Sequence, residues 1–420
     1  MSTTPAEGHR PATSPTSATS AATPLSAAPG QSADGFVTVP PGLAKVVVTD
    51  TALGDVRGDE GFYHYRQYSA VDLAEHVSFE EAAHLLLVGH LPDADELTDF
   101  AVELGRRRPL HPRLAALLPE ICRTTSDSLQ VLRTALSAWG GIADLRPLYD
   151  SSEEERREAV LSAIAVTPTI LAAAHRLQRG LEPHPADPSL GHAADYLRMV
   201  TGEQPAAHES RAVESYLVAT MDHGFNASTF TARVIASTGA DLAACLVGAI
   251  GSFSGPKHGG APSRALEALD EIGSLDRAAS WVRQRVEAGD RIMGFGHAVY
   301  RTRDPRSEML KGIARGWDDP LVDLAVGVED AVEQTLAELK PGRELHANVE
   351  FYAGVVMKLA GLHPSMFTPT FCVARVVGWG ANVLEQARDP KIIRPAARYV
   401  GPPPPQPLPA RTPATPTGSR

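Results

Sequence analysis

Three separated segments each contain one side chain that can transfer a proton, together with glycine or polar residues. They are Gly255-Pro256-Lys257-His258-Gly259-Gly260, Gly294-Phe295-Gly296-His297 and Asn348-Val349-Glu350-Phe351-Tyr352. A carboxylate can remove a proton from carbon, while imidazoles can donate hydrogen bonds to oxygens on which negative charge develops. The sequence therefore indicates acid–base catalysis, with His258, His297 and Glu350 as the candidate catalytic residues.

In this order, the two imidazoles and the carboxylate resemble the catalytic triad of the citrate synthase family, bacterial type. An isolated His-Gly-Gly motif is weak evidence, but the resemblance runs from about Gly42 to Pro402. Further matching segments are Asp222-His223-Gly224-Phe225-Asn226-Ala227-Ser228-Thr229-Phe230, Asp304-Pro305-Arg306, Gly378-Trp379, Glu385-Gln386, Ile393-Arg394-Pro395 and Tyr399-Val400-Gly401-Pro402.

The resemblance implies a Claisen-type condensation of acetyl-CoA with oxaloacetate and water, which gives citrate and CoA at the entry to the tricarboxylic acid cycle. Glu350 would take the methyl proton, and His258 would stabilise the enolate as a neutral donor. His297 would polarise the ketone and protonate the alkoxide. His258 suits its role if its other ring nitrogen accepts from backbone near a helix N-terminus, such as a helix beginning near Pro262-Ser263.

The resemblance also implies the binding residues. Planar guanidinium groups are natural partners for the two carboxylates of oxaloacetate, and the matching positions are His223, Arg306, Arg375 and Arg394, the last reaching into the neighbouring subunit's active site. For CoA the matching positions are Ile292, Met293, Gly294, Phe295, Gly296, Arg301 and Arg343. We expect no metal ligands and no cofactor, because acetyl-CoA is a co-substrate.

The periodicity of the chain predicts an almost wholly helical protein. Ser78 and Glu81 form a capping box for a helix that ends near Gly89, and Leu97, Phe100, Ala101 and Leu104 repeat at helical spacing. An apolar helix around Leu242 to Ile250 leads into the His258 loop. One hairpin is predicted from Val46-Val47-Val48 and Phe62-Tyr63-His64-Tyr65, across a turn-rich stretch from Gly54 to Gly61. Neither a Rossmann fingerprint nor a P-loop occurs.

The family resemblance supplies the predicted domain layout. Residues 36–260 and 358–401 would form a large helical domain, and residues 261–357 a smaller inserted one, with the active site in the cleft between them. Residues 1–35 and 402–420 are rich in Ala, Thr, Ser and Pro and are predicted to be disordered. The family resemblance further implies a homodimer or a higher homo-oligomer.

Composition excludes several classes of protein. The 420 residues are 43% hydrophobic, and the net charge is −11 with no basic block, which argues against a nucleic-acid or anionic-membrane partner. The three cysteines, Cys122, Cys245 and Cys372, lie far apart, which argues against a disulfide framework. We expect no membrane-spanning run of about 18 apolar residues and no signal peptide, and therefore a cytoplasmic protein.

Three departures from the family pattern keep alternatives open. Glu350 stands where most members have aspartate, Pro262-Ser263 replaces the usual Asn-Glu, and Gln67 stands where glycine is usual. Glycine geometry at Gln67 would be strained. One alternative is a 2-methylcitrate synthase that uses propionyl-CoA, since propionyl-CoA differs from acetyl-CoA by only one methylene and an apolar pocket discriminates weakly between them. The other is a non-catalytic sensor of CoA esters or citrate.

Overall fold

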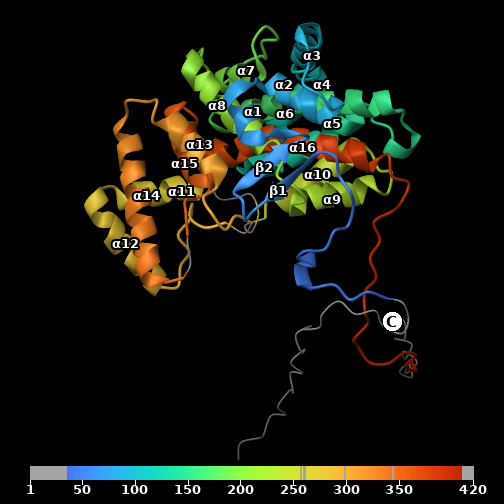
Figure 1. Cartoon of the computed structure of the whole chain (residues 1–420). Helices are drawn as coiled ribbons and strands as arrows, with labels where there is room; N and C mark the ends of the chain where they lie inside the picture. The colour runs from blue at the N-terminus through green and yellow to red at the C-terminus, as the bar shows by residue number, and fades with distance from the viewer. Residues whose placement is uncertain (1–35, 256–257, 259–261, 298, 343–344, 409–420) are drawn as a thin grey trace, which may run out of the picture. The chain divides into compact units, whose positions relative to one another are not determined.

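The computed structural model describes residues 36–255, 258, 262–297, 299–342 and 345–408, with the backbone alone at 262–264 (Figure 1). The chain divides after Thr51 into two compact units, and the short 3-10 helix η1 (Pro41–Leu43) is the one helix in residues 36–51. The site lies in the unit that begins at Ala52. The predicted disordered segments 1–35 and 409–420 are outside the described residues, whereas residues 402–408 are exposed and form neither helix nor strand.

The described part of the second unit is built from sixteen α-helices and one small sheet, which confirms the all-α prediction. The helices are α1 (Ala70–His76), α2 (Phe79–Val88), α3 (Ala94–Arg106), α4 (Pro112–Thr124), α5 (Ser128–Ile142), α6 (Glu153–Gln178), α7 (His192–Thr201), α8 (Ala207–Thr220), α9 (Ala227–Ala236), α10 (Leu242–Phe253), α11 (Pro262–Ile272), α12 (Leu275–Glu287), α13 (Pro305–Ala314), α14 (Pro320–Leu339), α15 (Val349–Leu359) and α16 (Phe367–Gln386), with the 3-10 helices η2 (Leu148–Asp150) and η3 (Pro364–Met366).

The sheet corrects the hairpin prediction. Strand β1 (Gly54–Arg57) pairs antiparallel with β2 (Phe62–Tyr65), which pairs with β3 (Tyr68–Ser69). The segment Val46-Val47-Val48 is not a strand; β1 lies in the stretch predicted to be a turn. A four-residue connection closes this hairpin at a smaller loss of chain entropy than the longer connection we predicted. Tyr63 and Tyr65 are the buried side chains of β2.

Several helix boundaries follow local signals in the sequence. Ser78 and Glu81 form the predicted capping box, and Gly89 ends α2 in the left-handed conformation. Pro262 opens α11, as a first-turn proline can. Gln67 does not have the positive φ that would strain it. The neighbouring Arg66 does, with φ of 52°, so the turn between β2 and β3 places its unusual geometry one residue earlier.

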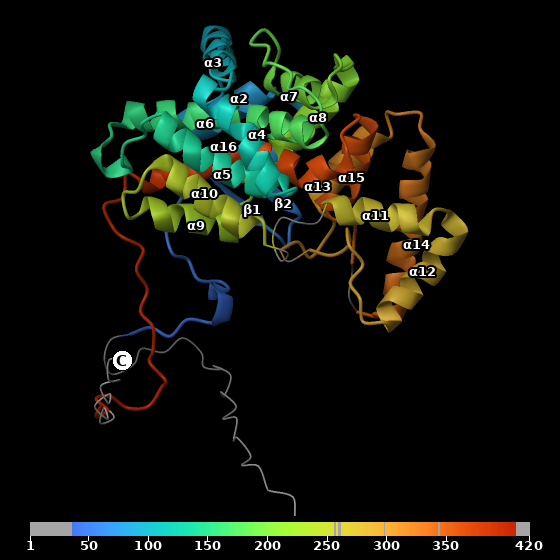
Figure 2. The same ribbon diagram turned by 180° about the vertical axis from the view of Figure 1, so that it is seen from behind.

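Helices α6 and α16 form the centre of the core (Figures 1 and 2). They pack on each other, and α16 also contacts α8, α9 and α10. Contrary to our expectation, α6 holds an 18-residue window apolar and long enough to cross a bilayer, with a mean hydropathy of 1.5. Of this window, 83% is buried inside the protein. Such burial is typical of a core helix, and α6 is surrounded by α4, α5, α7 and α16.

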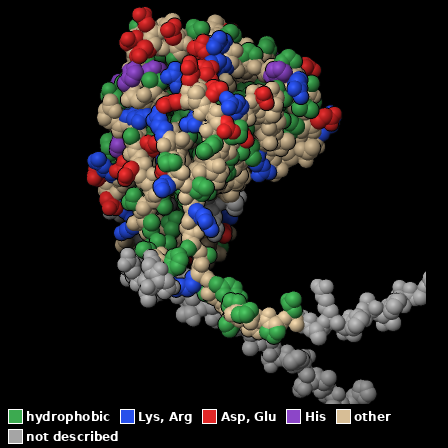
Figure 3. Space-filling model, turned by 90° about the vertical axis from the view of Figure 1, so that its right-hand side faces the viewer, with side chains coloured by type: hydrophobic (Ala, Val, Ile, Leu, Met, Phe, Trp, Pro, Cys, Tyr) green, Lys and Arg blue, Asp and Glu red, His purple; other side chains and the backbone are tan. Residues whose placement is uncertain are grey.

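Helices α11 to α15 pack mainly on one another. α12 lies along α14, and α11 and α13 both pack on α15 (Figures 1 and 2). Contacts of α13 and α15 with α8 join this group to the core helices. The domain boundaries at 260/261 and 357/358 stay a prediction. On the face in Figure 3, acidic and basic side chains are interspersed, in keeping with the absence of a basic block in the sequence.

Candidate active site

Two of the predicted segments are paired by their backbones. The amide of Asn348 donates to the carbonyl of Gly294 at 2.8 Å, the amide of Gly296 donates to the carbonyl of His346 at 2.8 Å, and Asn348 Nδ2 donates to the carbonyl of Gly296 at 2.9 Å. Gly294 and Gly296 have φ of 84° and 82°, which glycine adopts without strain. This pairing brings His297 to the segment that opens α15 with Glu350.

The ring of His297 is held in one neutral form. Its Nδ1 accepts from the amides of Val299 and Tyr300, both at 3.0 Å, so the ring proton must be on Nε2. Burial and the charge of Arg306 lower the pKa of His297 to about 4. Arg306 Nη2 lies 3.3 Å from the same Nε2. Two donors therefore face each other, and an acceptor oxygen placed between them would satisfy both.

Arg306 is fixed by a buried carboxylate. It is 3% exposed and binds Asp304 through two hydrogen bonds, Nε to Oδ1 at 3.0 Å and Nη2 to Oδ2 at 2.8 Å. Asp304 also caps α13 and accepts from the amide of Val349 at 3.0 Å. Burial raises the pKa of Asp304, but the Arg306 guanidinium outweighs it and holds that pKa below its ordinary value. Asp304 thus ties the start of α13 to the start of α15.

His223 belongs to the same cluster. Its Nε2 lies 2.9 Å from the hydroxyl of Tyr300, and its ring contacts those of His297 and Tyr63. Burial, with the nearby charge of Arg306, holds the pKa of His223 well below its ordinary value. The imidazole is therefore neutral and can serve as a hydrogen-bonding group near Arg306 without adding charge.

His258 has the geometry of a neutral donor. The amide of Ser228, in the first turn of α9, faces His258 Nε2 at 3.3 Å, and the hydroxyl of Ser228 lies 2.8 Å from the same atom. Because an amide can only donate, Nε2 is the acceptor and the proton is on Nδ1. Burial and the charge of Arg375 lower the pKa of His258 to about 4. The backbone donor predicted for this ring comes from α9, whereas the sequence had suggested α11.

Glu350 is the second residue of α15, with its amide bonded to Asn348 Oδ1 at 3.0 Å. Burial raises the pKa of its carboxyl to about 7, against the opposing charge of Arg306. Among the described residues, the carboxylate has no ion-pair or hydrogen-bond partner. A carboxylate of this pKa is suited to act as a general base near neutral pH.

Arg375 lies on α16 and is 2% exposed. Its Nε donates to the carbonyl of Thr220 at 2.9 Å, and its guanidinium lies 4.7 Å from the ring centre of Phe371. Within the described part of the chain, no carboxylate lies within ion-pair distance of it. Burial lowers the pKa of Arg375 from its ordinary value. Its terminal nitrogens are therefore suited to a carboxylate from a ligand.

The candidate CoA-binding residues do not all line one pocket. A pocket of about 690 Å³ is lined by Gly296, His297 and the exposed Arg301, together with residues of the loop before α15. Ile292, Met293, Gly294 and Phe295 form the loop that leads to this pocket. Arg343 lies outside the described residues. Arg394 is exposed in the extended segment after α16 and contacts none of the described histidines of the cluster.

Sequence reasoning missed several residues that hold this site together. Tyr300 lies within hydrogen-bond distance of His223 and its ring contacts that of His297, and Asp304 orients Arg306. Trp379 Nε1 donates to Ser228 Oγ at 3.1 Å, which anchors the residue that orients His258. These residues lie in or beside the segments that match the family. Each is only a few positions from a candidate histidine or arginine, and this closeness in sequence could have identified them.

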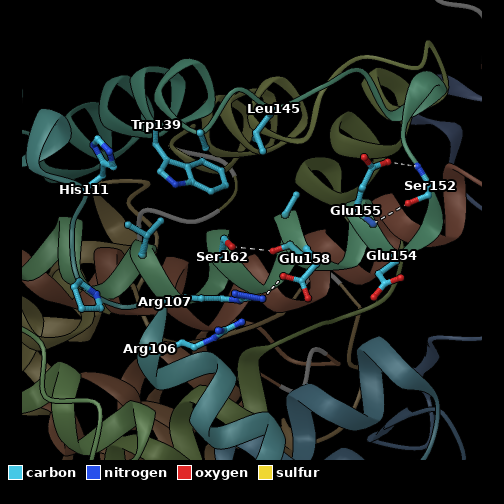
Figure 4. Close-up of a pocket in the computed structure, with 14 residues that line it drawn as sticks. Arg106, Arg107, His111, Trp139, Leu145, Ser152, Glu154, Glu155, Glu158 and Ser162 are labelled. Atoms are coloured by element: carbon cyan, nitrogen blue, oxygen red, sulfur yellow. Dashed lines mark hydrogen bonds and ion pairs between the residues drawn. The ribbon is translucent and has the colours of Figure 1, made fainter.

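A second large pocket, of about 630 Å³, lies between α3, α5 and α6 (Figure 4). Several of its charged groups have partners within the protein: Arg107 pairs with Glu158, and Glu155 accepts from the amide of Ser152 at 2.6 Å. Figure 4 shows the Arg107 side chain directed at Glu158. This pocket holds none of the predicted catalytic residues, so the cluster around His297 is the better candidate active site.

Comparison with known proteins gives a consistent result. The family profile described as "Citrate synthase, C-terminal domain" matches residues 42–396. A citrate synthase of Deinococcus radiodurans is 35% identical over 361 residues, covering 86% of this chain and 95% of the relative.

Solved structures agree. The citrate synthase of Pyrobaculum aerophilum is 33% identical with a TM-score of 0.80, over 91% of this chain and 97% of that one. The citrate synthase of Thermoplasma acidophilum was solved as a ternary complex with carboxymethyl coenzyme A and oxaloacetate. It is 26% identical with a TM-score of 0.79, over 87% of this chain and 97% of that one. The chain therefore belongs to the citrate synthase family of acyltransferases.

Proposed function

We propose that this protein is a citrate synthase that condenses acetyl-CoA with oxaloacetate and water to give citrate and CoA. The observation that carries the proposal is the protonation pattern of the site: two neutral imidazoles, each with its proton position set by backbone amides, and one carboxylate with a raised pKa. This pattern supplies two uncharged donors and one base, which the condensation requires.

In the proposed reaction, Glu350 removes a proton from the methyl group of acetyl-CoA. Nδ1–H of His258 donates to the thioester oxygen and stabilises the enolate, whose carbon attacks the ketone of oxaloacetate. Nε2–H of His297 polarises that ketone and transfers its proton to the new alkoxide. Water then cleaves the thioester of citryl-CoA, so that citrate and CoA leave.

The two facing donors support the binding of oxaloacetate. Arg306 and His297 would share its oxygens, and Arg375 would bind the second carboxylate, because its terminal nitrogens have no carboxylate partner among the described residues. His223 would add a neutral contact. The Thermoplasma acidophilum relative was solved with oxaloacetate and carboxymethyl coenzyme A, which supports both substrate classes for this chain.

CoA would enter along the loop from Ile292 to Gly296 and the pocket that Arg301 lines, with Arg301 and Arg343 near its phosphates. Arg394 is exposed in the single chain; in the proposed homodimer it would complete the partner's site. No further cofactor is part of the proposal, and the expected location is the cytoplasm.

A 2-methylcitrate synthase that uses propionyl-CoA remains the second candidate, because the same catalytic groups serve both reactions. The test is thiol release by the purified protein with oxaloacetate, with acetyl-CoA and propionyl-CoA compared under identical conditions. Preference for acetyl-CoA is the expected result. Preference for propionyl-CoA would replace the proposal with the second candidate, and no release with either would favour the non-catalytic sensor.

A further inference from the structure

We propose a divalent transition-metal site, suited to Zn²⁺, where the end of α2 meets the start of α3. Its ligands would be His84, His90 and Glu96. One ring nitrogen of each histidine and one oxygen of Glu96 lie within 4.8 Å of one another. Within the described residues, this is the one group of three His, Cys, Asp or Glu side chains with ligand atoms so close. It lies outside the site described above.

His84 has the hydrogen bond that typically orients a metal-binding imidazole. Its Nδ1 lies 2.9 Å from the backbone carbonyl of His90, which can only accept. The proton of the neutral ring is therefore on Nδ1, and Nε2 carries the lone pair. Histidines that bind metals commonly donate their other ring nitrogen to a carbonyl in this way. His84 is 6% exposed and its ring packs against that of Phe100, so it would be a rigid ligand.

His90 and Glu96 already form one half of the site. Nε2 of His90 lies 3.1 Å from both carboxylate oxygens of Glu96. Bond lengths of about 2.0 to 2.2 Å at a tetrahedral Zn²⁺ separate neighbouring ligand atoms by about 3.3 Å. This pair therefore has nearly the required spacing. The ion would take the place of the proton between the two side chains, and that proton would move through solvent to Nδ1 of His90.

The fold keeps Glu96 in place independently of a metal. Its Oε2 accepts from the amide of Asp93 at 3.0 Å, in the capping box that opens α3. Oε1 can bind an ion while that capping bond persists. His90 and Glu96 are half-exposed, so rotation of their side chains can close the widest spacing. Two imidazoles, one carboxylate and water as a fourth ligand make a set that Zn²⁺ accepts.

The experiment is a titration of the purified, metal-free full-length protein with Zn²⁺ in competition with a chromophoric chelator. We expect one equivalent bound at this site, and at least a tenfold loss of affinity in His90→Gln and in Glu96→Gln. Both positions are half-exposed, so the variants should fold.

Two substitutions serve as matched controls. Glu81→Gln removes the equivalent capping carboxylate of α2, which accepts from the amide of Ser78 at 2.7 Å and bonds no histidine among the described residues. His76→Gln removes an exposed histidine at the end of α1. Both controls should retain the affinity of the unaltered protein. The visible spectrum of the Co²⁺-loaded protein should show the strong bands of four-coordinate cobalt, and these should vanish in His90→Gln.

Equal Zn²⁺ affinity in the unaltered protein, His90→Gln and Glu96→Gln would overturn the proposal, since any binding would then be elsewhere, such as the catalytic histidines. Absence of binding in the unaltered protein would overturn it too. Neither result depends on catalytic activity, so failure of the metal site is distinguishable from failure of the proposed reaction.

Discussion

Two buried clusters in this protein differ in how many of their charged side chains have an ionic partner. Beside α7, Arg108 is 1% exposed and is surrounded by acceptors: Glu80 at 3.5 Å, Asp195 at 3.4 Å and the carbonyl of Leu190 at 2.7 Å. In the active site, neither Arg375 nor Glu350 has an ion-pair partner among the described residues. The buried cation Arg108 thus has carboxylate partners in the protein, although its Nε has no hydrogen-bond partner among the described residues. Groups that await a ligand, by contrast, are left without an ionic partner.

The largest expected effect is on catalysis. Glu350→Gln keeps the shape of the side chain but removes the base, so turnover should fall by about 10²- to 10⁴-fold. Thiol release with saturating substrates measures this loss. Oxaloacetate affinity, measured by calorimetry, should change little, because Arg306 and Arg375 stay intact. Turnover equal to that of the unaltered protein would show that Glu350 is not the base.

The second effect is on stability, in the satisfied cluster. Arg108→Met leaves the carboxylate of Glu80 buried without its cation, while Asp195 keeps its ion pair with Arg198 at 2.8 Å. The loss should lower the free energy of unfolding by about 3 to 5 kcal/mol. Urea unfolding measures it. Arg123→Met is the control, because the pair of Arg123 with Glu120 is exposed and should contribute less than about 1 kcal/mol. Equal losses in the two variants would contradict the comparison.

Arg375→Met should affect ligand affinity more than stability. Within the part of the chain that the structure describes, no carboxylate within ion-pair distance is left behind, and the methionine can fill the buried space on α16. We expect oxaloacetate to bind about 100-fold more weakly, as for the loss of a charge-assisted contact of about 2 to 3 kcal/mol. Calorimetric titration checks this. A variant that binds oxaloacetate normally but unfolds as easily as Arg108→Met would place Arg375 among the structural charges.

Glu350 should lower stability at neutral pH. Its folded pKa of about 7 lies above its ordinary value of 4.5, so the folded state holds this proton more tightly. The tighter binding of this proton stabilises the folded state. Its contribution is full below about pH 4.5 and is lost as the pH rises through 7. Glu350→Gln has no charge to bury and should therefore be more stable than the unaltered protein at pH 8, by about 1 to 3 kcal/mol. Unfolding curves at pH 8 and pH 5 should show this difference shrinking as the pH falls.

The raised pKa of Glu350 also predicts how kcat/KM changes with pH, which is the smallest of the expected effects. The base must be ionised, so kcat/KM should fall about tenfold per pH unit below pH 7 and level off above it. His258 and His297, with pKa values lowered to about 4, stay neutral across this range. Measuring kcat/KM with acetyl-CoA between pH 5.5 and 8.5 tests this decline on the acidic side. A midpoint near the ordinary value of glutamate would mean that the carboxylate is better solvated than the structure indicates.

The sequence by itself determined the helical class, the capping box at Ser78 and the segments that carry His258, His297 and Glu350. These features are local, since helix periodicity, caps and glycine-flanked motifs depend on neighbours along the chain. The same locality explains the failed hairpin: Val46-Val47-Val48 has a strand-like composition, but the choice of β1 as the partner of β2 depended on closing a short loop.

Only the tertiary structure decided which ring nitrogen of each catalytic histidine carries the proton. The proton of His297 is placed by its neighbouring amides, and that of His258 by Ser228, thirty residues away. The raised pKa of Glu350 comes from burial by many segments. The group of His84, His90 and Glu96 was likewise missed, because its ligands come from a helix, a turn and a capping position. Contacts and burial of this kind depend on distances in space, which spacing along the chain does not reveal.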